Sequence, residues 1–225
     1  MSSFNRDPLD GSLSNDGVFY SNSTELSLLT PINVRNEYQQ LPNETLKMLQ
    51  QNLSNDVSLL LCNVRTGGNI SMIVRHACLL GFKEIIICGR KHYDKRFTVG
   101  AHNYVPIEYV DSILNVSITC QPKTNLFNEK ITYFPNEFVK ILGDRTPVFL
   151  EQGGTDIREV PWNILKNVII IVGNESVGIP TEFINDIKKL IPKTLTVSIP
   201  QWSVMRSMNC AMALATIMWE IRRKS

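Results

Sequence analysis

The stretch at 167–172, NVIIIV, constrains the fold most because it is the most β-like run in the chain and a glycine-rich loop, GNESVGIP, follows it at once. Two further apolar runs share this character, VSLLLC at 57–62 and EIIIC at 84–88. Short continuous apolar runs are typical of strands buried on both faces of a parallel sheet. Because segments of helical periodicity alternate with these runs, the sequence predicts an α/β fold, with a mostly parallel sheet and helices on both faces.

The remaining elements follow from periodicity and turn residues. Apolar residues recur at helical spacing in 70–80, where Gly81 ends the helix, and in a helix that Asn43 is expected to cap. Further helices are expected at 135–142 and 181–190, and further strands at 104–110, 146–150 and 194–199, with a turn at EQGGTD after the second of these strands. Residues 1 to about 40 are predicted to form an irregular arm, and 111–133 favour no single element.

The end of the chain combines a strand, a polar loop and an apolar helix. Pro200 stops the strand, and a helix rich in Met and Ala follows the loop at 200–209 and continues to about 222. One side of that helix and its approach carries Met205, Met208, Met212, Ala215 and Trp219, and Ala213, Leu214, Ile217 and Met218 fill much of the rest. Such a helix is either a core helix that closes the domain or one that is covered twice, by its own core and by a partner chain.

Composition narrows the class of protein. A length of 225 residues allows one sizeable core, alone or with an appendage, and a net charge of +2 means that any nucleic-acid binding depends on local basic patches. The five cysteines are odd in number and lack CxxC spacing, and Cys62, Cys78 and Cys88 sit in apolar runs typical of buried free thiols. We therefore expect an intracellular, cytoplasmic protein. No apolar run reaches transmembrane length, and the first residues lack a signal-peptide pattern, so no membrane is expected.

Several familiar sites are excluded by their missing motifs. The chain has no GxGxxG after its first strand, no GxxxxGK[ST] and no GxSxG. The three histidines, His76, His92 and His102, show no metal-ligand spacing, so no metal is expected. Three polar loops, at 63–69, 173–180 and 200–209, each follow a predicted strand. Each loop taken alone is explained as a turn, but ligands bind at the carboxyl ends of strands in open α/β sheets, and together the three loops predict a shared site.

Three sequence blocks resemble a known family. Asn69 followed by Arg75 on a helix, IVGNESVGIP at 171–180 and IPQWSVMRSMN at 199–209 resemble the three motifs of SpoU or TrmH type RNA ribose 2'-O-methyltransferases, in the SPOUT superfamily. The resemblance spans 57–222 and is closest to the eukaryotic-type tRNA guanosine 2'-O-methyltransferase domains. One departure is visible, because Gln201 and Ser203 stand where the third motif usually has Met and Gly. That departure concerns the loop that would contact the cofactor.

The resemblance implies a fold and a cofactor. It implies a deep C-terminal trefoil knot within a SPOUT methyltransferase domain at 56–225, preceded at 1–55 by an N-terminal arm and a short helix. S-adenosylmethionine would be the cofactor, and the family's assembly would be a homodimer. The residues implied to hold the cofactor are Leu150, Glu151, Gln152, Gly153, Val172, Gly173, Asn174, Gly178, Ile199, Pro200, Gln201 and Met208.

The resemblance also implies the catalytic residues. Arg75 matches the family's catalytic arginine, which would reach the site across the dimer, while Asn69, Ser207 and Asn209 would orient it and the ribose. Glu175 would brace the knot or contact the substrate. Arg75 is either the base or a cation that stabilises the developing alkoxide, and both readings stay open because a guanidinium remains protonated in proteins. Without the motif, Arg75 would be taken as part of a solvated helix face.

The expected partner is RNA, with tRNA preferred. Four cations, Arg90, Lys91, Lys95 and Arg96, are interleaved with Tyr93 and Phe97 on one loop, which suits phosphate contact and base stacking. A merely solvated loop explains the same residues. Three alternative functions remain: the same activity on ribosomal RNA, a SPOUT-fold RNA-binding protein without catalysis, and an α/β metabolite-binding domain, which the three blocks disfavour.

Overall fold

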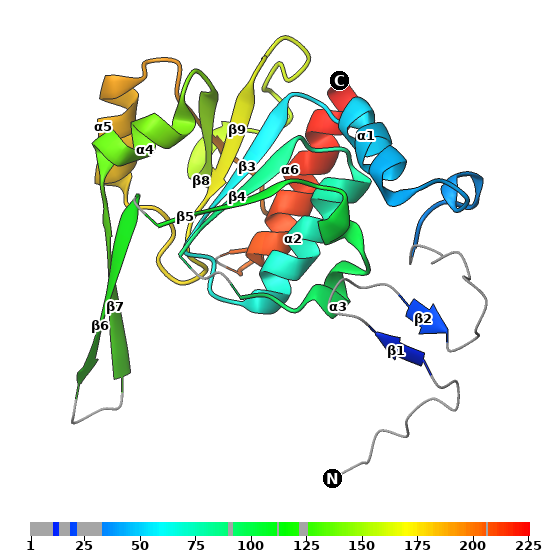
Figure 1. The fold of residues 1–225 in the computed structure, drawn as a ribbon. Helices are drawn as coiled ribbons and strands as arrows, with labels where there is room; N and C mark the ends of the chain where they lie inside the picture. The colour runs from blue at the N-terminus through cyan, green and yellow to red at the C-terminus, as the bar shows by residue number, and fades with distance from the viewer. Residues whose placement is uncertain are drawn as a thin grey trace.

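The computed structural model describes residues 33–89, 92–111, 113–121, 126–205 and 207–225, together with two short strands, β1 (Gly11–Leu13) and β2 (Phe19–Ser21). Figure 1 shows the arrangement of the helices and strands. Six of the strands form one sheet: β3 (Val57–Cys62), β4 (Glu84–Cys88), β5 (Ile107–Val110), β8 (Thr146–Asp156), β9 (Val168–Val172) and β10 (Leu195–Ser198).

The sheet has the order β10-β8-β9-β3-β4-β5, and every neighbouring pair is parallel. The two central strands, β3 and β9, are buried along their whole length. Continuous apolar runs form such strands because both of their faces are covered, so alternation with polar residues is not required. The prediction of an α/β protein with a mostly parallel sheet is therefore confirmed.

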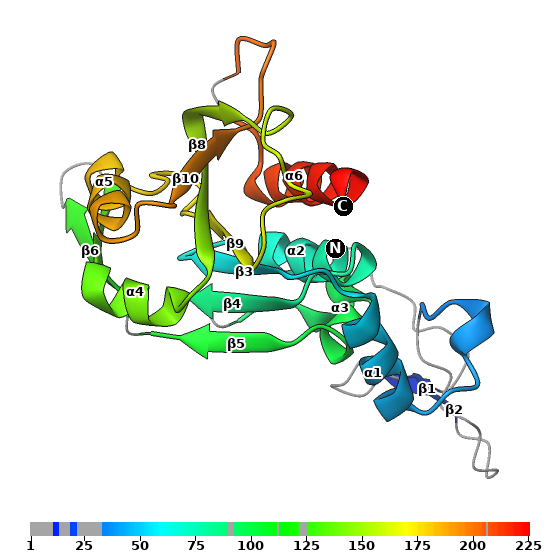
Figure 2. The same cartoon turned by 90° about the horizontal axis from the view of Figure 1, so that it is seen from above.

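Helices cover both faces of the sheet. On one face, α2 (Gly67–Leu79) and α6 (Cys210–Lys224) pack side by side, as Figures 1 and 2 show, and their buried residues join Leu59 and Leu61 of β3 in one core. On the other face, α4 (Pro135–Leu142) and α5 (Thr181–Leu190) share a second core with Leu60 and Cys62. Successive residues of β3 thus enter opposite cores, as the two-residue period of a strand requires.

Smaller elements surround these layers. The 3-10 helix η1 (Asn36–Tyr38) and the helix α1 (Asn43–Leu53) precede the sheet, and α3 (Lys95–Thr98) and η2 (Ala101–Asn103) follow β4. The strands β6 (Leu114–Gln121) and β7 (Leu126–Tyr133) form an antiparallel ribbon that projects from the body in Figure 1. They occupy the stretch that local patterns left unassigned.

Three local predictions need correction. The helix after Pro42 is present, but the Asn43 side chain does not cap it, and its Oδ1 instead accepts a weak hydrogen bond from the Tyr104 hydroxyl at 3.4 Å. The strand expected at 104–110 begins only at Ile107, because the chain first makes η2. The turn predicted at EQGGTD is part of β8.

The pairing of β8 with β10 explains the last correction. Phe149 pairs with Thr196 and Thr155 pairs with Val197, so residues 150–154 bulge out between two paired segments. A Cβ on Gly154 would lie 2.6 Å from backbone atoms of Thr196, so glycine permits the close approach of β10. Glycines that suggest a turn locally therefore serve a contact with a strand that lies about forty residues further along the chain.

Candidate functional site

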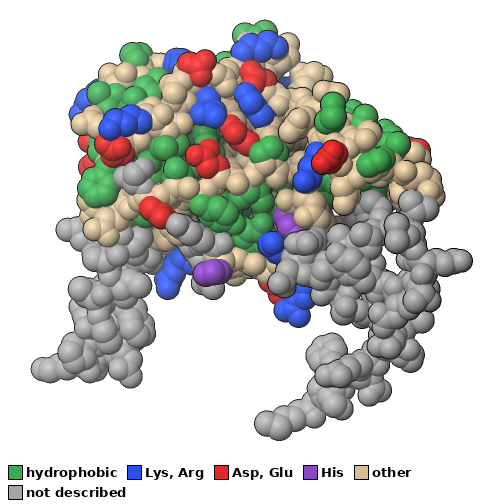
Figure 3. All heavy atoms as spheres, in the orientation of Figure 1, with side chains coloured by type: hydrophobic (Ala, Val, Ile, Leu, Met, Phe, Trp, Pro, Cys, Tyr) green, Lys and Arg blue, Asp and Glu red, His purple; other side chains and the backbone are tan. Residues whose placement is uncertain are grey.

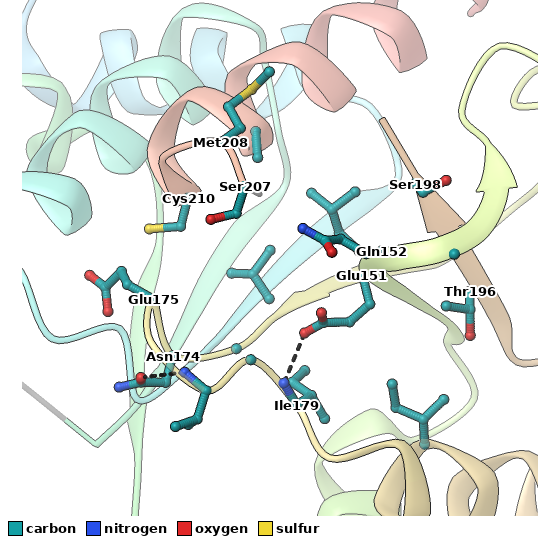
Figure 4. Close-up of a pocket in the computed structure, with 18 of the residues that line it drawn as sticks. Glu151, Gln152, Asn174, Glu175, Ile179, Thr196, Ser198, Ser207, Met208 and Cys210 are labelled. Carbon is teal, nitrogen blue, oxygen red and sulfur yellow. Dashed lines mark hydrogen bonds between the residues drawn. The ribbon is translucent and has the colours of Figure 1, made fainter. Parts of the chain in front are cut away.

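A pocket of about 780 Å³ lies at the carboxyl ends of β8, β9 and β10 and is drawn in Figure 4. Its walls are the bulge at 150–153, the loop after β9, the end of β10 and the approach to α6. These walls include two of the three loops that the sequence analysis expected to converge. Sites of this size are typical of small-molecule ligands in α/β proteins.

The loop after β9 is folded tightly upon itself. A Cβ on Gly173 would lie 2.5 Å from the carbonyl carbon of Gly178, so only glycine allows these two backbone segments to touch. The Asn174 Oδ1 accepts hydrogen bonds from the backbone N–H groups of Ser176 (2.9 Å) and Val177 (3.2 Å). Its Nδ2 donates to the backbone oxygen of Asn63 at 3.1 Å, which joins this loop to the loop after β3.

Glu175 connects the first motif to the second. Its carboxylate accepts hydrogen bonds from the backbone N–H groups of Arg65 (2.9 Å) and Thr66 (3.1 Å) and from Asn69 Nδ2 (2.9 Å). Partial burial acts to raise the pKa of Glu175, but these three donors outweigh it and hold the pKa below its usual value. The side chain is therefore an ionised acceptor at neutral pH.

Asn69 extends the network to the third motif. Its Oδ1 accepts a hydrogen bond from Asn209 Nδ2 at 3.0 Å. The Oδ1 of Asn209 in turn accepts from the backbone N–H groups of Ala211 (2.9 Å) and Met212 (3.3 Å), so Asn209 is the N-cap of α6. We call the hydrogen-bonded series Glu175–Asn69–Asn209 the three-motif network, because it joins all three motif blocks. Asn69 lies more than 100 residues from each of its two partners in the sequence.

Glu151 places a second carboxylate in the pocket. Its Oε1 accepts a hydrogen bond from the backbone N–H of Ile179 at 2.8 Å, the dashed contact in Figure 4, and so ties the bulge of β8 to the loop after β9. Burial raises the pKa of Glu151, although the N–H groups of Ile179 and Gln152 partly offset this effect. The carboxyl group faces a pocket whose lining combines backbone, polar side chains and apolar side chains such as Leu150 and Ile199.

Cys210 also lines the pocket but is not a nucleophile. Burial and the nearby charge of Glu175 raise the pKa of its thiol to about 12. Because the thiolate and not the thiol attacks electrophiles, the group stays inert at neutral pH. Cys210 is consequently a lining residue of the pocket and not a reactive group.

The structure gathers most of the predicted cofactor residues around this pocket. Those that line it are Leu150, Glu151, Gln152, Gly153, Val172, Gly173, Asn174, Gly178, Ile199, Gln201 and Met208. Pro200 is not among the lining residues. Of the predicted catalytic residues, Glu175, Ser207 and Asn209 line the pocket, and Asn69 touches it through its hydrogen bonds to two of them.

The other predicted residues lie elsewhere. Arg75 lines a separate pocket beside α1 and is absent from the walls of the large one. Lys95 and Arg96 are exposed on α3, where Arg96 is paired with Asp94 at 2.6 Å, and Arg90 and Lys91 lie outside the described residues. Among the described residues, one chain therefore does not bring Arg75, Lys95 or Arg96 into the lining of the large pocket.

Some lining residues were missed by sequence reasoning. Thr196 and Ser198 come from β10, and Asn185 and Lys188 come from α5. The alternation of Thr196 and Ser198 at the end of a predicted strand was a usable indication, because carboxyl ends of strands meet at ligand sites. No local pattern pointed to Lys188, whose position depends on how α5 packs.

In the described part of the chain, no group of three or more His, Cys, Asp or Glu side chains is placed to hold a metal ion. Among the same residues, none of the helices combines the length and the apolar character needed to cross a membrane.

The fold and the pocket define an α/β protein with a parallel sheet and a large pocket at the carboxyl ends of β8, β9 and β10. The sequence model of the SpoU rRNA Methylase family matches residues 56–219, and the chain belongs to this family. The predicted family is therefore confirmed. No curated protein matches the chain significantly.

Solved structures share the fold. The TrmH/SpoU tRNA modifying enzyme of A. aeolicus is 22% identical, with a TM-score of 0.58 and 81% of each chain covered. The AdoMet-bound rRNA methyltransferase of Sinorhizobium meliloti is also 22% identical, with a TM-score of 0.55, and the match covers 79% of this chain and 59% of that one. AviRb of Streptomyces viridochromogenes in complex with AdoMet is 20% identical, with a TM-score of 0.55, and the match covers 79% of this chain and 61% of that one. The chain thus spans about three fifths of two of these proteins.

Proposed function

We propose that the protein is an S-adenosylmethionine-dependent RNA ribose 2'-O-methyltransferase that acts on tRNA. One observation carries the proposal: the three-motif network joins residues from all three motif blocks at the wall of a single pocket. A family membership supports RNA methylation, and the network supports a site that is assembled for chemistry and not merely retained in sequence.

The pocket residues fit S-adenosylmethionine. Leu150, Ile199 and Met208 offer apolar surface for an adenine ring, and the Glu151 carboxylate offers an acceptor for ribose hydroxyls or for an ammonium group. Gly173 and Gly178 keep the loop after β9 thin, so its backbone can approach a ligand closely. When bound, the cofactor supplies a methyl group on a positively charged sulfur. AdoMet is present in two of the solved neighbours.

The predicted catalytic residues are proposed to carry out the methyl transfer to the ribose. The attacking 2'-hydroxyl must lose its proton, and a nearby cation stabilises the developing alkoxide. Arg75 supplies that cation, or acts as the base, in the large pocket of a partner chain, since Arg75 does not line the large pocket of its own chain. Asn69, Ser207 and Asn209 orient the ribose, and Glu175 holds Asn69 in place through the contact at 2.9 Å.

This arrangement requires a homodimer, which the surface of α6 supports. Met212 and Trp219 on α6 are 44% and 61% exposed, and Met208 in the approach to the helix is 41% exposed, whereas Leu214, Ile217 and Met218 are buried in the core. An exposed apolar stripe on a helix whose other side is fully packed is typical of a partner surface. The helix thus has a second apolar side that the single chain leaves exposed, as expected for a helix that a partner chain also covers.

RNA contacts complete the proposal. Figure 3 shows Lys and Arg side chains interspersed with Asp and Glu over the face drawn, so binding depends on local groups and not on a broad positive field. Lys95 and Arg96, with Arg90 and Lys91, are proposed to contact phosphates. A tRNA modifying enzyme among the neighbours supports tRNA, and an rRNA methyltransferase among them supports the alternative.

The finer features of the family are part of the same proposal. They comprise the C-terminal trefoil knot, the division of the chain into an N-terminal segment at 1–55 and a methyltransferase domain at 56–225, and an intracellular location. The edge order β10-β8-β9 supports the knot, the family match at 56–219 supports the division, and free thiols at Cys62, Cys78, Cys88 and Cys210 support a reducing compartment.

Arg75→Ala separates an enzyme from a binding protein. Arg75 is half-buried at the wall of the second pocket, so the variant should stay folded and dimeric and should bind S-adenosylmethionine normally. Removing one strong electrostatic contact to the transition state lowers turnover by about 100-fold or more. The measurement is the yield of 2'-O-methyl nucleosides in digests of tRNA and rRNA incubated with wild type and variant. Near-normal transfer by the variant refutes the role of Arg75, and no transfer by wild type to either RNA favours the binding protein.

A further inference from the structure

A second pocket, of about 280 Å³, lies between η1, α1 and α2. One wall comes from α2 and η2, which lie within the family match at 56–219, and the other wall comes from residues 33–53, which precede it. The volume is just below the range typical of drug-sized ligands. This pocket, which we call the α1–α2 pocket, is therefore small.

Three arginines converge on the α1–α2 pocket from three separate elements. Arg35 precedes η1, Arg75 lies in the middle of α2 and Arg222 lies in the last turn of α6. No Asp or Glu is among the described residues that line it. An anion bound there would meet guanidinium groups and no carboxylate of the pocket lining. The lining consequently favours a negatively charged group such as a phosphate.

The existing partners leave the arginines available for a ligand. Arg35 forms an exposed ion pair with Glu37 at 3.5 Å, which is a weak contact. One N–H of Arg222 donates to the backbone oxygen of Leu53 at 2.9 Å, and a guanidinium carries further N–H donors that can bind an anion. A phosphate oxygen can therefore replace solvent at these groups without breaking the fold.

The rest of the lining suits a ring and not a bare anion. Tyr38 and Tyr104 are half-buried at the pocket, beside Leu49 and Leu80, and Leu46 is buried beneath them. Aromatic side chains beside apolar surface accept a planar base, and cations beside them accept its phosphate. A nucleotide combines both parts in one unit.

We propose that the α1–α2 pocket binds one nucleotide of the substrate RNA strand, with a phosphate on Arg35 and Arg222 and the base against Tyr38 and Tyr104. The inference rests on the proposed function in taking RNA as the substrate. Because Arg75 lines the same pocket, a nucleotide seated there is held beside the group assigned to the reacting ribose. Residues 33–53 then contribute to the choice of RNA, which the family domain alone would not determine.

The charge half of the proposal is tested with Arg35→Ala. Binding of a bulk tRNA preparation is measured by fluorescence anisotropy across a salt series, with Lys140→Ala as control, since Lys140 is exposed on α4 and paired only with Glu137 at 2.7 Å. Arg35→Ala should weaken binding about fivefold and lower the salt slope by about one, as for loss of one phosphate contact. Arg35→Lys should restore the slope, and Glu37→Gln, which frees Arg35, should strengthen binding.

The ring half is tested with Tyr38→Ala. Loss of a stacking surface should weaken RNA binding at least fivefold with an unchanged salt slope, and Tyr38→Phe should restore it. Calorimetry should show unchanged S-adenosylmethionine affinity for all of these variants. If Arg35→Ala and Tyr38→Ala bind tRNA as Lys140→Ala does while wild type methylates RNA, the pocket proposal alone is refuted. If wild type neither binds nor methylates RNA, the proposed function fails with it.

Discussion

Replacing Glu175 by Gln tests whether the three-motif network holds the site together. Glutamine keeps the shape, but its NH₂ group would face one of the backbone N–H groups of Arg65 and Thr66, which now donate at 2.9 and 3.1 Å. A hydrogen bond to a charged acceptor contributes about 1.5–3 kcal/mol, and water can partly replace it here because both donors are exposed, so we expect a loss of about 1–2 kcal/mol. For a chain of this size that lowers the melting temperature by about 2–8 °C.

The pH dependence of this loss is the stricter test. The pKa of Glu175 is lowered from 4.5 because its donors outweigh burial, so its contribution to stability is complete above pH 4.5 and disappears as the pH falls through the lower folded value. The difference in unfolding free energy between wild type and Glu175→Gln should therefore be full at neutral pH and shrink on acidification. Denaturant titrations of both proteins, at neutral pH and at an acidic pH below 4.5, measure this difference. Glu137→Gln, which removes only the surface pair with Lys140, should lose no more than about 0.5 kcal/mol. A difference for Glu175→Gln that is the same at every pH would refute the assignment.

The remaining predictions concern the loop after β9 and the surface of α6. Gly173→Ala puts a Cβ 2.5 Å from the backbone of Gly178, so we expect S-adenosylmethionine binding to weaken at least tenfold and stability to fall by about 1–3 kcal/mol. The control is Gly153→Ala, whose Cβ would meet no atom within 4 Å. Because Gly153 has a φ of 78°, this variant should lose only about 1–2 kcal/mol through backbone strain. Calorimetry and thermal unfolding of both variants measure these effects, and equal cofactor binding by the two would contradict them. Trp219→Glu places a charge on the exposed stripe of α6, where Trp219 is 61% exposed, so light scattering should give a monomer for the variant and a dimer for wild type at micromolar concentration, and a wild-type monomer would exclude the dimer.

Local patterns identified the elements whose burial is uniform or strictly periodic. The strands at 57–62 and 84–88 and the helix at 181–190 have the predicted bounds, because a strand covered on both faces must be apolar throughout and an amphipathic helix must repeat its apolar residues. The stretch 111–133 could not be assigned, since β6 and β7 are defined mainly by their pairing with one another, although Leu114 and Tyr133 at one end of the ribbon join the core beneath α4 and α5. A ribbon of that kind leaves a weaker pattern.

For the site, the motifs identified Asn69, Glu175 and Asn209, but only the fold shows that they are linked through hydrogen bonds of 2.9 and 3.0 Å. The bulge of β8 and the contribution of Lys188 were equally beyond reach, because both depend on where β10 and α5 lie against segments far away in the chain. The sequence by itself determined which segments are buried and which residue types stand in each loop, since burial periodicity and motif spacing are local properties. The tertiary structure alone decided which loops meet, that Arg75 lies apart from the large pocket of its own chain, and that residues 33–53 complete a second pocket. The physical reason is that such meetings are set by the packing of segments distant in the chain, and their free energy is shared among many contacts that no short stretch of sequence records.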